Sequence, residues 1–308
     1  MRQSQSLEKI KKEKKRGVLS SYLRARGIYL NRERGQNLLH DPSMLKKIVS
    51  VARVGPGDAV VEIGAGIGNL TKVLAERAGS ILAIEVDRGL VRLLEEELAH
   101  LENVKVIHAD GLSFDYLALR KEMGKKLKLV ANLPFSISTP ILMHLIKHRD
   151  AFESMHLTFQ KEVAERLVAT PGTKSYSVLT VMVQMYLEPK IIVYIPRTCF
   201  FPRPKVDACL VGFRIRQEPL VGMSCPEIFE KVVKASFAQR RKVLANSLVS
   251  LSDFFASQRD VVAVCEAAGI DPRRRGETLT IKEFARLADS IHDAGRAPVD
   301  TARSPASE

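Results

Sequence analysis

The chain has 308 residues, of which 45% are hydrophobic and 27% charged, as in ordinary globular proteins of one large or two smaller domains. No apolar run approaches the roughly 20 residues of a membrane-spanning helix. The N-terminus also lacks the apolar stretch of a secretion signal, so we expect a cytoplasmic protein without membrane contact. The four cysteines form no CxxC pair, which predicts reduced thiols and no metal site.

Charge is distributed unevenly along the chain. The net charge is +13, with a pI of about 9.6. Residues 1–34 carry 11 Lys and Arg against 3 acidic residues, and residues 197–286 carry 16 against 10, whereas residues 35–196 are nearly balanced at 19 against 18. Two basic flanks indicate a polyanionic partner, most commonly nucleic acid. For the N-terminal run taken alone, a solvated tail is the alternative.

From residue 42 the hydrophobic pattern alternates between helix and strand. The predicted elements are, in order, 42–54 (helix), 59–66 (strand), 69–79 (helix), 80–87 (strand), 89–101 (helix), 104–110 (strand) and 126–134 (strand). Strands that are apolar throughout and separated by helices are typical of a parallel sheet covered on both faces. We therefore predict a doubly wound, Rossmann-like α/β domain, whose ligands bind at the carboxyl ends of the strands.

The second half of the chain extends this domain and then becomes helical. Residues 152–169, 176–189 and 205–215 are expected to add strands and helices to the α/β domain. Over residues 227–251 a helical stripe of apolar side chains runs from Phe229 to Leu248, and further helical segments follow. The predicted organisation is a basic extension (1–20), a catalytic domain (21–220), a helical RNA-binding domain (221–290) and a disordered tail (291–308).

The first predicted strand runs into a glycine-rich loop. Gly64 and Gly66 allow a tight turn and a close approach to a ligand. A nicotinamide dinucleotide fingerprint would have glycine where this chain has Asn69. Glu85 ends the second strand, where its carboxylate can accept from ribose hydroxyls, and Asp110 ends the third, where it can accept from an adenine amino group. Ribose and adenine contacts without a diphosphate cradle favour S-adenosylmethionine over a nicotinamide dinucleotide.

The fourth strand ends in the sequence Asn132-Leu133-Pro134-Phe135. The exocyclic amine of a base is a poor nucleophile because its lone pair is delocalised into the ring. Two acceptors, the Asn132 side-chain oxygen and the Leu133 carbonyl, can draw its N–H groups out of plane. Pro134 stiffens the turn, and Phe135 offers a face on which a flipped base can stack. Catalysis would then consist of orientation and acceptor placement, without a general base.

Long blocks of the chain resemble the small-subunit ribosomal RNA adenine dimethyltransferases. "NLPF" resembles the (N/D)PP(Y/F)-type motif of amino-methylating enzymes, and the similarity runs from about residue 20 to 288. It includes the stretches "RERGQNLLHDP", "VEIGAGIGNLT", "HADGLSF", "FQKEVAERLVATPGTKSY", "FFPRPKVDACLV", "ASFAQRRKVLANSL" and "DPRRRGETLTIKEFARLA". The resemblance implies an enzyme that uses S-adenosylmethionine to dimethylate N6 of two adjacent adenines in the 3′-terminal hairpin loop of small-subunit ribosomal RNA. It would act as a monomer during assembly of the small ribosomal subunit.

The same resemblance implies roles for individual residues. The implied cofactor contacts are Asn37, Leu39, Gly64, Gly66, Glu85, Asp110 and Asn132. The implied catalytic group is Asn132, Leu133, Pro134, Phe135 and Phe200, with Phe200 near the target base opposite Phe135. The basic side chains assigned to RNA contacts are Lys205, Arg240, Arg241, Lys242, Arg273, Arg274 and Arg275.

Departures from the family pattern are few and leave two alternatives. Phe135 replaces the Tyr usual in bacterial members, Leu38 replaces a Phe, and Ser177 stands where Gly commonly follows the Tyr. Phe at the first of these positions also occurs in large-subunit methyltransferases of the macrolide-resistance type, which are the nearest enzyme alternative. The alternative from another class is a methyltransferase-fold protein that acts as an assembly or nucleic-acid-binding factor.

Overall fold

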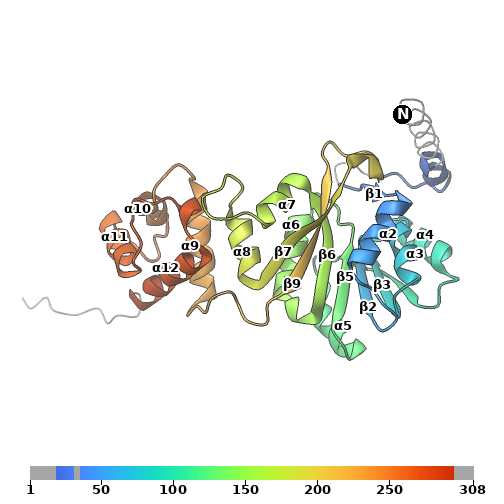
Figure 1. Ribbon diagram of the computed structural model, residues 1–308, viewed down its shortest axis with the longest axis horizontal. Helices are drawn as coiled ribbons and strands as arrows, with labels where there is room; N and C mark the ends of the chain where they lie inside the picture. Colours follow the sequence, from blue (N-terminus) through green and yellow to red (C-terminus); the bar gives the residue numbers. More distant parts are fainter. Residues whose placement is uncertain (1–18, 31–34, 295–308) are drawn as a thin grey trace, which may run out of the picture. The chain divides into compact units, whose positions relative to one another are not determined.

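The computed structural model describes residues 19–30 and 35–294. It divides into two compact units (Figure 1). The α/β unit comprises the chain up to Glu165 together with Leu187–Ile215, and the helical unit comprises Arg166–Tyr186 and the chain from Arg216 onward. The predicted extension (1–20) and tail (291–308) fall mostly outside the described residues. Within the described ranges, no helix has both the length and the apolar character needed to cross a membrane.

The α/β unit is built on a seven-stranded sheet with the order β4-β3-β2-β5-β6-β9-β7 (Figure 1). Strands β2 to β6 pair in parallel, and β9 pairs antiparallel with both β6 and β7. The bounds are β2 (Ala59–Ile63), β3 (Ser80–Glu85), β4 (Val104–His108), β5 (Leu127–Ala131), β6 (Phe152–Gln160), β7 (Leu187–Ile195) and β9 (Ala208–Ile215). The four predicted strands are β2 to β5, and the prediction of a mainly parallel sheet is confirmed.

Helices cover both faces of this sheet. They are α2 (Pro42–Val51), α3 (Asn69–Ala75), α4 (Arg88–Leu98), α5 (Tyr116–Met123), α6 (Ser138–Lys147) and α7 (Lys161–Leu167). The connection through α3 moves from β2 to β3, whereas the connection through α5 moves the opposite way, from β4 to β5. Because such crossovers are right-handed, α3 and α5 lie on opposite faces. The strand order reverses beside β2, which places a crevice at the carboxyl ends of β2 and β5.

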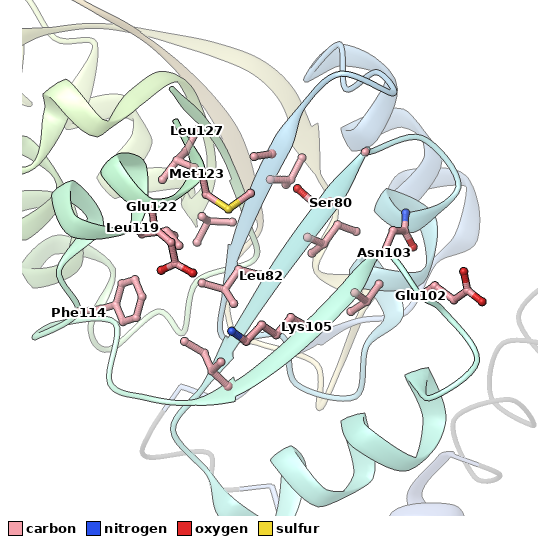
Figure 2. Close-up of a pocket in the computed structure, with 17 residues that line it drawn as sticks. Ser80, Leu82, Glu102, Asn103, Lys105, Phe114, Leu119, Glu122, Met123 and Leu127 are labelled. Carbon is pink, nitrogen blue, oxygen red and sulfur yellow. The ribbon is translucent and has the colours of Figure 1, made fainter. Parts of the chain in front are cut away.

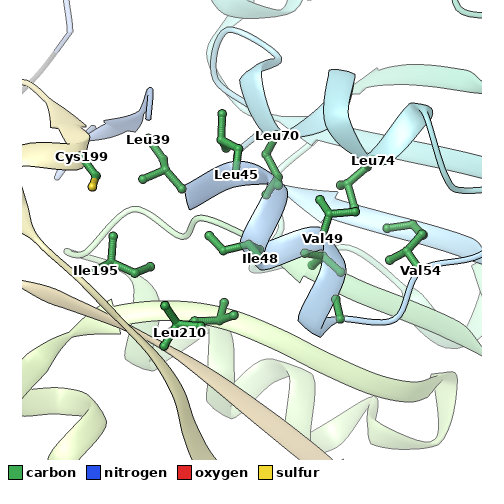
Figure 3. Close-up of a cluster of buried hydrophobic side chains, with 14 of the residues drawn as sticks. Leu39, Leu45, Ile48, Val49, Val54, Leu70, Leu74, Ile195, Cys199 and Leu210 are labelled. Carbon is green, nitrogen blue, oxygen red and sulfur yellow. The ribbon is translucent and has the colours of Figure 1, made fainter. Parts of the chain in front are cut away.

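One apolar core holds α2 and α3 against the sheet (Figure 3). Ile48 and Val49 of α2 and Leu74 of α3 are at most 3% exposed, and they pack with side chains of β2, β5, β7 and β9. Full burial of each such side chain contributes roughly 1.5–3 kcal/mol. This packing anchors the glycine loop that lies between β2 and α3. Two short strands, β1 (Leu38–Leu39) and β8 (Phe200–Phe201), pair antiparallel at the edge of the same core.

The helical unit has its own core. Its helices are α8 (Val178–Tyr186), α9 (Pro226–Ala238), α10 (Leu244–Ser247), α11 (Gln258–Ala267) and α12 (Ile281–Ala294). Phe229 and Val233 of α9, Leu244 of α10, and Phe284 and Leu287 of α12 are fully buried. Apolar side chains that recur at helical spacing therefore do form a separate hydrophobic core here, as the pattern indicates.

The structure differs from the predicted helical stripe at one point. Helix α9 ends at Ala238, and α10 begins only at Leu244. Leu244 and Ala245 donate their backbone N–H groups to the carbonyls of Arg274 and Pro272. The turn between the helices thus satisfies the first N–H groups of α10 through a distant segment, which local periodicity does not encode.

The segment Arg166–Tyr186 belongs to the helical unit, whereas the predicted helical domain begins at residue 221. Its contacts explain the difference. Arg216 donates its backbone N–H to the Tyr186 carbonyl, and the Tyr176 ring lies 5.7 Å from the ring of Phe237. Because these partners are 30 or more residues away, the association arises from tertiary packing.

Candidate active site

A cavity of about 300 Å³ lies at the carboxyl ends of the parallel strands. Its volume is within the range of small-molecule sites. Each of β2, β3, β4 and β5 contributes a predicted residue where the strand ends, namely Gly64, Glu85, Asp110 and Asn132. Four segments that are separate in the sequence therefore converge on one cavity, as the parallel topology requires.

Close packing against two neighbouring segments fixes the shape of the glycine loop. Gly64 and Gly66 have φ of +72° and +63°, in the left-handed region that favours glycine. A Cβ on Gly64 would lie 3.2 Å from Cδ of Pro134, and one on Gly66 would lie 2.8 Å from Cδ2 of Leu38. The loop therefore fits against the turn after β5 and against the segment Gly35–His40, which we call the strap.

Two side-chain amides hold the strap over the cavity. Asn132 donates through Nδ2 to the Asn37 carbonyl at 2.9 Å, and Asn69 donates through Nδ2 to the Leu39 carbonyl at 2.9 Å. Asn69 occupies the position that departs from the dinucleotide fingerprint, and its amide here anchors the strap. Asn37 lines the cavity, but the Leu39 side chain is 3% exposed and belongs to the hydrophobic core. The Leu39 side chain therefore does not line the cavity, and a cofactor contact through its backbone stays a prediction.

Glu85 organises the backbone around the cavity. Its Oε2 accepts from the Gly66 N–H at 2.9 Å, and its Oε1 accepts from the N–H groups of Val86 and Asp87 at 3.0 and 3.1 Å. Burial raises the pKa of Glu85, although these three donors act in the opposite direction. A carboxylate 5% exposed at a cavity wall can accept further hydrogen bonds from hydroxyl groups of a ligand.

Asp110 follows β4 and lines the same cavity, but it is exposed. Its Oδ1 accepts from the Leu112 N–H at 2.9 Å, which orients the carboxylate. The side chain retains free acceptor positions because a carboxylate offers about four lone-pair sites. This geometry suits recognition of an amino group at the open end of the cavity.

Asn132 has a defined orientation. Its Oδ1 accepts from the Thr158 hydroxyl at 2.8 Å while its Nδ2 donates to the strap. Leu133 as a whole is 1% exposed, and among the described residues no hydrogen bond reaches its backbone carbonyl. The Asn132 oxygen retains one lone pair, so the turn keeps an acceptor on a residue that lines the cavity.

The two aromatic rings do not form the expected stacking slot. The centroids of Phe135 and Phe200 are 5.9 Å apart, with the ring planes at 61°. Phe200, in β8, is 0% exposed and belongs to the hydrophobic core, whereas Phe135 is partly exposed. An aromatic ring inserted between two others needs about 7 Å, twice the optimal separation of carbon atoms. Phe135 therefore offers the accessible stacking surface, and the buried ring of Phe200 packs edge-on against it.

Three of the basic residues assigned to RNA make contacts within the helical unit. Arg240 donates to Glu277 Oε2 through Nε and Nη2, at 3.0 and 2.7 Å. Arg274 binds Glu283, with 2.5 Å between Nη1 and Oε1. Arg273 pairs with the neighbouring Asp271. Burial by itself would raise the pKa of Glu283, but hydrogen bonds from Arg274 and Thr280 lower this pKa to about 2.

The remaining basic side chains are better placed for an external partner. Arg241, Lys242 and Arg275 are exposed in the helical unit, and Lys205 is exposed in the α/β unit. Within residues 19–30 and 35–294 we find no ion pair to any of the four. Arg240 and Arg274 thus stabilise the helical unit, whereas these four leave their charges available for phosphate groups.

A second cavity, of about 480 Å³, lies between the sheet and α5 (Figure 2). Most of its lining is apolar, including Leu82 of β3, Leu119 and Met123 of α5, and Phe114. Its charged side chains do not converge on a common point in Figure 2. Among the described residues, no group of three or more His, Cys, Asp or Glu could hold a metal ion, and all four cysteines are free thiols.

Sequence reasoning missed two residues of the site. The Asn69 amide is visible in the sequence only as a departure from a motif, and its role depends on contact with a strap 30 residues away. Thr158 lies within β6 and carries no local signal. Only the register, in which Ala131 of β5 lies beside Leu157 of β6, places the next pair of residues, Asn132 and Thr158, together.

Comparisons with known proteins identify the family of this chain. Residues 28–293 match the family described as ribosomal RNA adenine dimethylase. Two similar curated proteins are both named ribosomal RNA small subunit methyltransferase A. The one from Moorella thermoacetica is 43% identical over 282 residues, which cover 89% of this chain and 97% of that protein. The one from Clostridium botulinum is 44% identical over 263 residues, which cover 85% and 94%.

Solved structures give the same result. The crystal structure of a dimethyladenosine transferase from Plasmodium falciparum has a TM-score of 0.72 and 26% identity, over 84% of this chain and 98% of that chain. The 23S rRNA methyltransferase ErmE has a TM-score of 0.61 and 26% identity, over 83% and 99%. Since the family match and the relatives each cover most of the sequence, the chain belongs to the ribosomal RNA adenine dimethylase family.

Proposed function

We propose that this enzyme dimethylates N6 of two adjacent adenines in the 3′-terminal hairpin loop of small-subunit ribosomal RNA, with S-adenosylmethionine as the methyl donor. The observation that carries the proposal is the turn after β5, where Asn132, whose side-chain oxygen keeps a free lone pair, lines the same cavity as Glu85 and Asp110. Its relatives named small subunit methyltransferase A support the choice of RNA.

The residues of the cavity suit S-adenosylmethionine, which supplies the methyl group when bound. Glu85 is placed to accept from the ribose hydroxyls, and Asp110 from the adenine amino group. Gly64 and Gly66 leave the cavity wall without side chains at the loop. The strap, which includes Asn37, closes the cavity on one side.

The target adenine would stack on Phe135 with its amino group toward Asn132 and Leu133. These two acceptors would bind the N–H groups and localise the nitrogen lone pair for methyl transfer, with S-adenosylhomocysteine as the leaving group. The resulting methylated aminium is acidic and loses a proton to water, so the site needs no general base. The chain's own contribution is orientation, electrostatic complementarity and removal of the base from the stack.

A large-subunit substrate is the second candidate, because the fold matches ErmE with a TM-score of 0.61. The identity to that protein is 26%, compared with 43–44% to the small-subunit relatives. This difference supports the small subunit. We further propose that the enzyme works as a monomer in the cytoplasm on an assembling subunit, and that Arg241, Lys242, Arg275 and Lys205 contact RNA phosphates.

Primer extension tests the proposed function directly. Dimethyladenine blocks reverse transcription, so small-subunit RNA from cells lacking the protein should be read through, and the purified enzyme should restore two adjacent stops on isolated small subunits. The large-subunit RNA of the same cells is the matched control. Stops that disappear from large-subunit RNA instead would establish the alternative substrate, and unchanged stops on both RNAs would contradict methylation of either.

A further inference from the structure

The buried hydroxyl of Thr158 lies directly behind the proposed catalytic amide. Thr158 is 0% exposed within β6, the strand beside β5, and its Oγ1 is 2.8 Å from Oδ1 of Asn132. A buried hydroxyl without this partner would be an unsatisfied polar group. The contact is therefore a defined part of the site and connects the sheet interior to the catalytic turn.

The direction of this hydrogen bond follows from the neighbouring groups. The Asn37 carbonyl can only accept, so the Asn132 atom facing it at 2.9 Å must be the nitrogen. The other amide atom, which faces Thr158, is then the oxygen, and the hydroxyl must donate to it. One lone pair of the Asn132 oxygen is thereby occupied, and one remains for a substrate N–H.

We propose that Thr158 is a positioning residue that holds the Asn132 side-chain oxygen in place for methyl transfer. The terminal torsion of an asparagine is soft and roughly two-fold, so packing alone does not distinguish its oxygen from its nitrogen. The Asn37 carbonyl makes that distinction because it can only accept, and the Thr158 hydroxyl then holds the oxygen toward β6 by donating to it. The Thr158 hydrogen bond thus leaves one lone pair of the Asn132 oxygen as the acceptor for the substrate, while the amide nitrogen holds the strap.

The competing explanation is that Thr158 only fills space in a strand. The two explanations predict opposite rankings of variants. If shape is what matters, Thr158→Val is the best replacement, because Val is β-branched, similar in volume and favourable in strands. If the hydrogen bond matters, Thr158→Ser is the best, Thr158→Cys is intermediate because a thiol is a weak donor, and Thr158→Val is the worst.

The test measures single-turnover methylation of isolated small subunits, with saturating cofactor, for all three variants. We expect Thr158→Val to reduce the rate about fivefold to tenfold, the effect of one hydrogen bond, with Thr158→Ser within about twofold of the native enzyme. Thermal unfolding of the same variants shows whether a slower rate follows a loss of stability, because Ser leaves a small cavity and Val removes the hydrogen bond. The matched control is Thr180→Val in the helical unit. This change removes the hydrogen bond that another fully buried hydroxyl donates to the Arg166 carbonyl, and it should leave the methylation rate unchanged.

The inference rests on the proposed function, and the experiment separates the two. If the native enzyme fails to methylate small subunits, the proposed function is wrong. If the native enzyme is active but Thr158→Val is as fast as Thr158→Ser, or faster, Thr158 does not position Asn132. If Thr158→Val fails to fold, the comparison of Ser with Cys still decides, since the hydrogen-bond explanation requires the Cys variant to be slower.

Discussion

Replacing Glu85 with Gln should weaken cofactor binding more than any other single change at the cavity wall. The amide oxygen of the introduced glutamine can take the place of Oε1 and accept from Val86 and Asp87. Its NH₂ group then faces the Gly66 N–H at the position of Oε2, where two donors oppose each other. The variant therefore lacks one charge-assisted hydrogen bond to the loop and an acceptor for the ribose hydroxyls.

Each hydrogen bond to a charged group is worth about 1.5–3 kcal/mol, so we expect affinity to fall by roughly 10- to 150-fold. Calorimetric titration with S-adenosylhomocysteine would measure this decrease, and thermal unfolding without ligand would show whether the loop has collapsed. Asp110→Asn is the matched control, because Asp110 is exposed and its carboxylate accepts from the backbone N–H of Leu112. The affinity of the Asp110→Asn variant for S-adenosylhomocysteine should fall less than about tenfold.

A 2′-deoxy analogue of the ligand separates ribose recognition from support of the loop. The native enzyme should discriminate strongly against the analogue, and Glu85→Gln should discriminate weakly, because the acceptor for that hydroxyl has changed. If the folded variant binds S-adenosylhomocysteine with native affinity, or if it discriminates as strongly as the native enzyme, Glu85 does not bind the ribose.

Three further predictions concern the base, the RNA and the helical unit. Phe135→Ala should slow the second methylation more than the first, because monomethyladenine has one N–H left and depends more on stacking, which is worth about 1–3 kcal/mol. Mass spectrometry of nucleosides should show that monomethyladenine accumulates, and a product of dimethyladenine alone would contradict this. Neutralising Arg241 and Arg275 should reduce the slope of log affinity against log salt by about 0.7–0.9 for each phosphate group that is no longer neutralised, and an unchanged slope would place the phosphate-binding side chains elsewhere. Glu283→Gln should destabilise the helical unit at pH 7. Because hydrogen bonds with Arg274 and Thr280 lower the folded pKa of Glu283 to about 2, the difference in stability between variant and native protein should shrink as pH falls from about 4.5 toward 2. A difference in thermal unfolding that stays constant between about pH 7 and pH 3 would exclude the ion pair as its cause.

Local patterns were sufficient for the elements that position the site. The four apolar strands and the intervening helices are recognisable because burial on both faces makes a parallel strand apolar throughout. Glu85, Asp110 and Asn132 were predictable as neighbours because parallel strands bring their carboxyl ends to one edge. The glycine loop was predictable because a left-handed backbone and a close approach both favour residues without a side chain.

The partners of these residues depended on contacts between distant segments. The orientation of Asn132 is set by Asn37, 95 residues earlier, and by Thr158, 26 residues later. Phe200 has the chemical character of a stacking residue, yet the pairing of β1 with β8 buries it completely.

Charge shows the same division between local and tertiary information. Arg240 and Arg241 are adjacent in the sequence and identical in type, but Arg240 is held by Glu277 while Arg241 is exposed. A residue's chemical type and its place in an element are local properties, so they can be read along the chain. Its partners and its burial are set by strand register and by packing between segments far apart in the sequence, and these exist only in the folded protein.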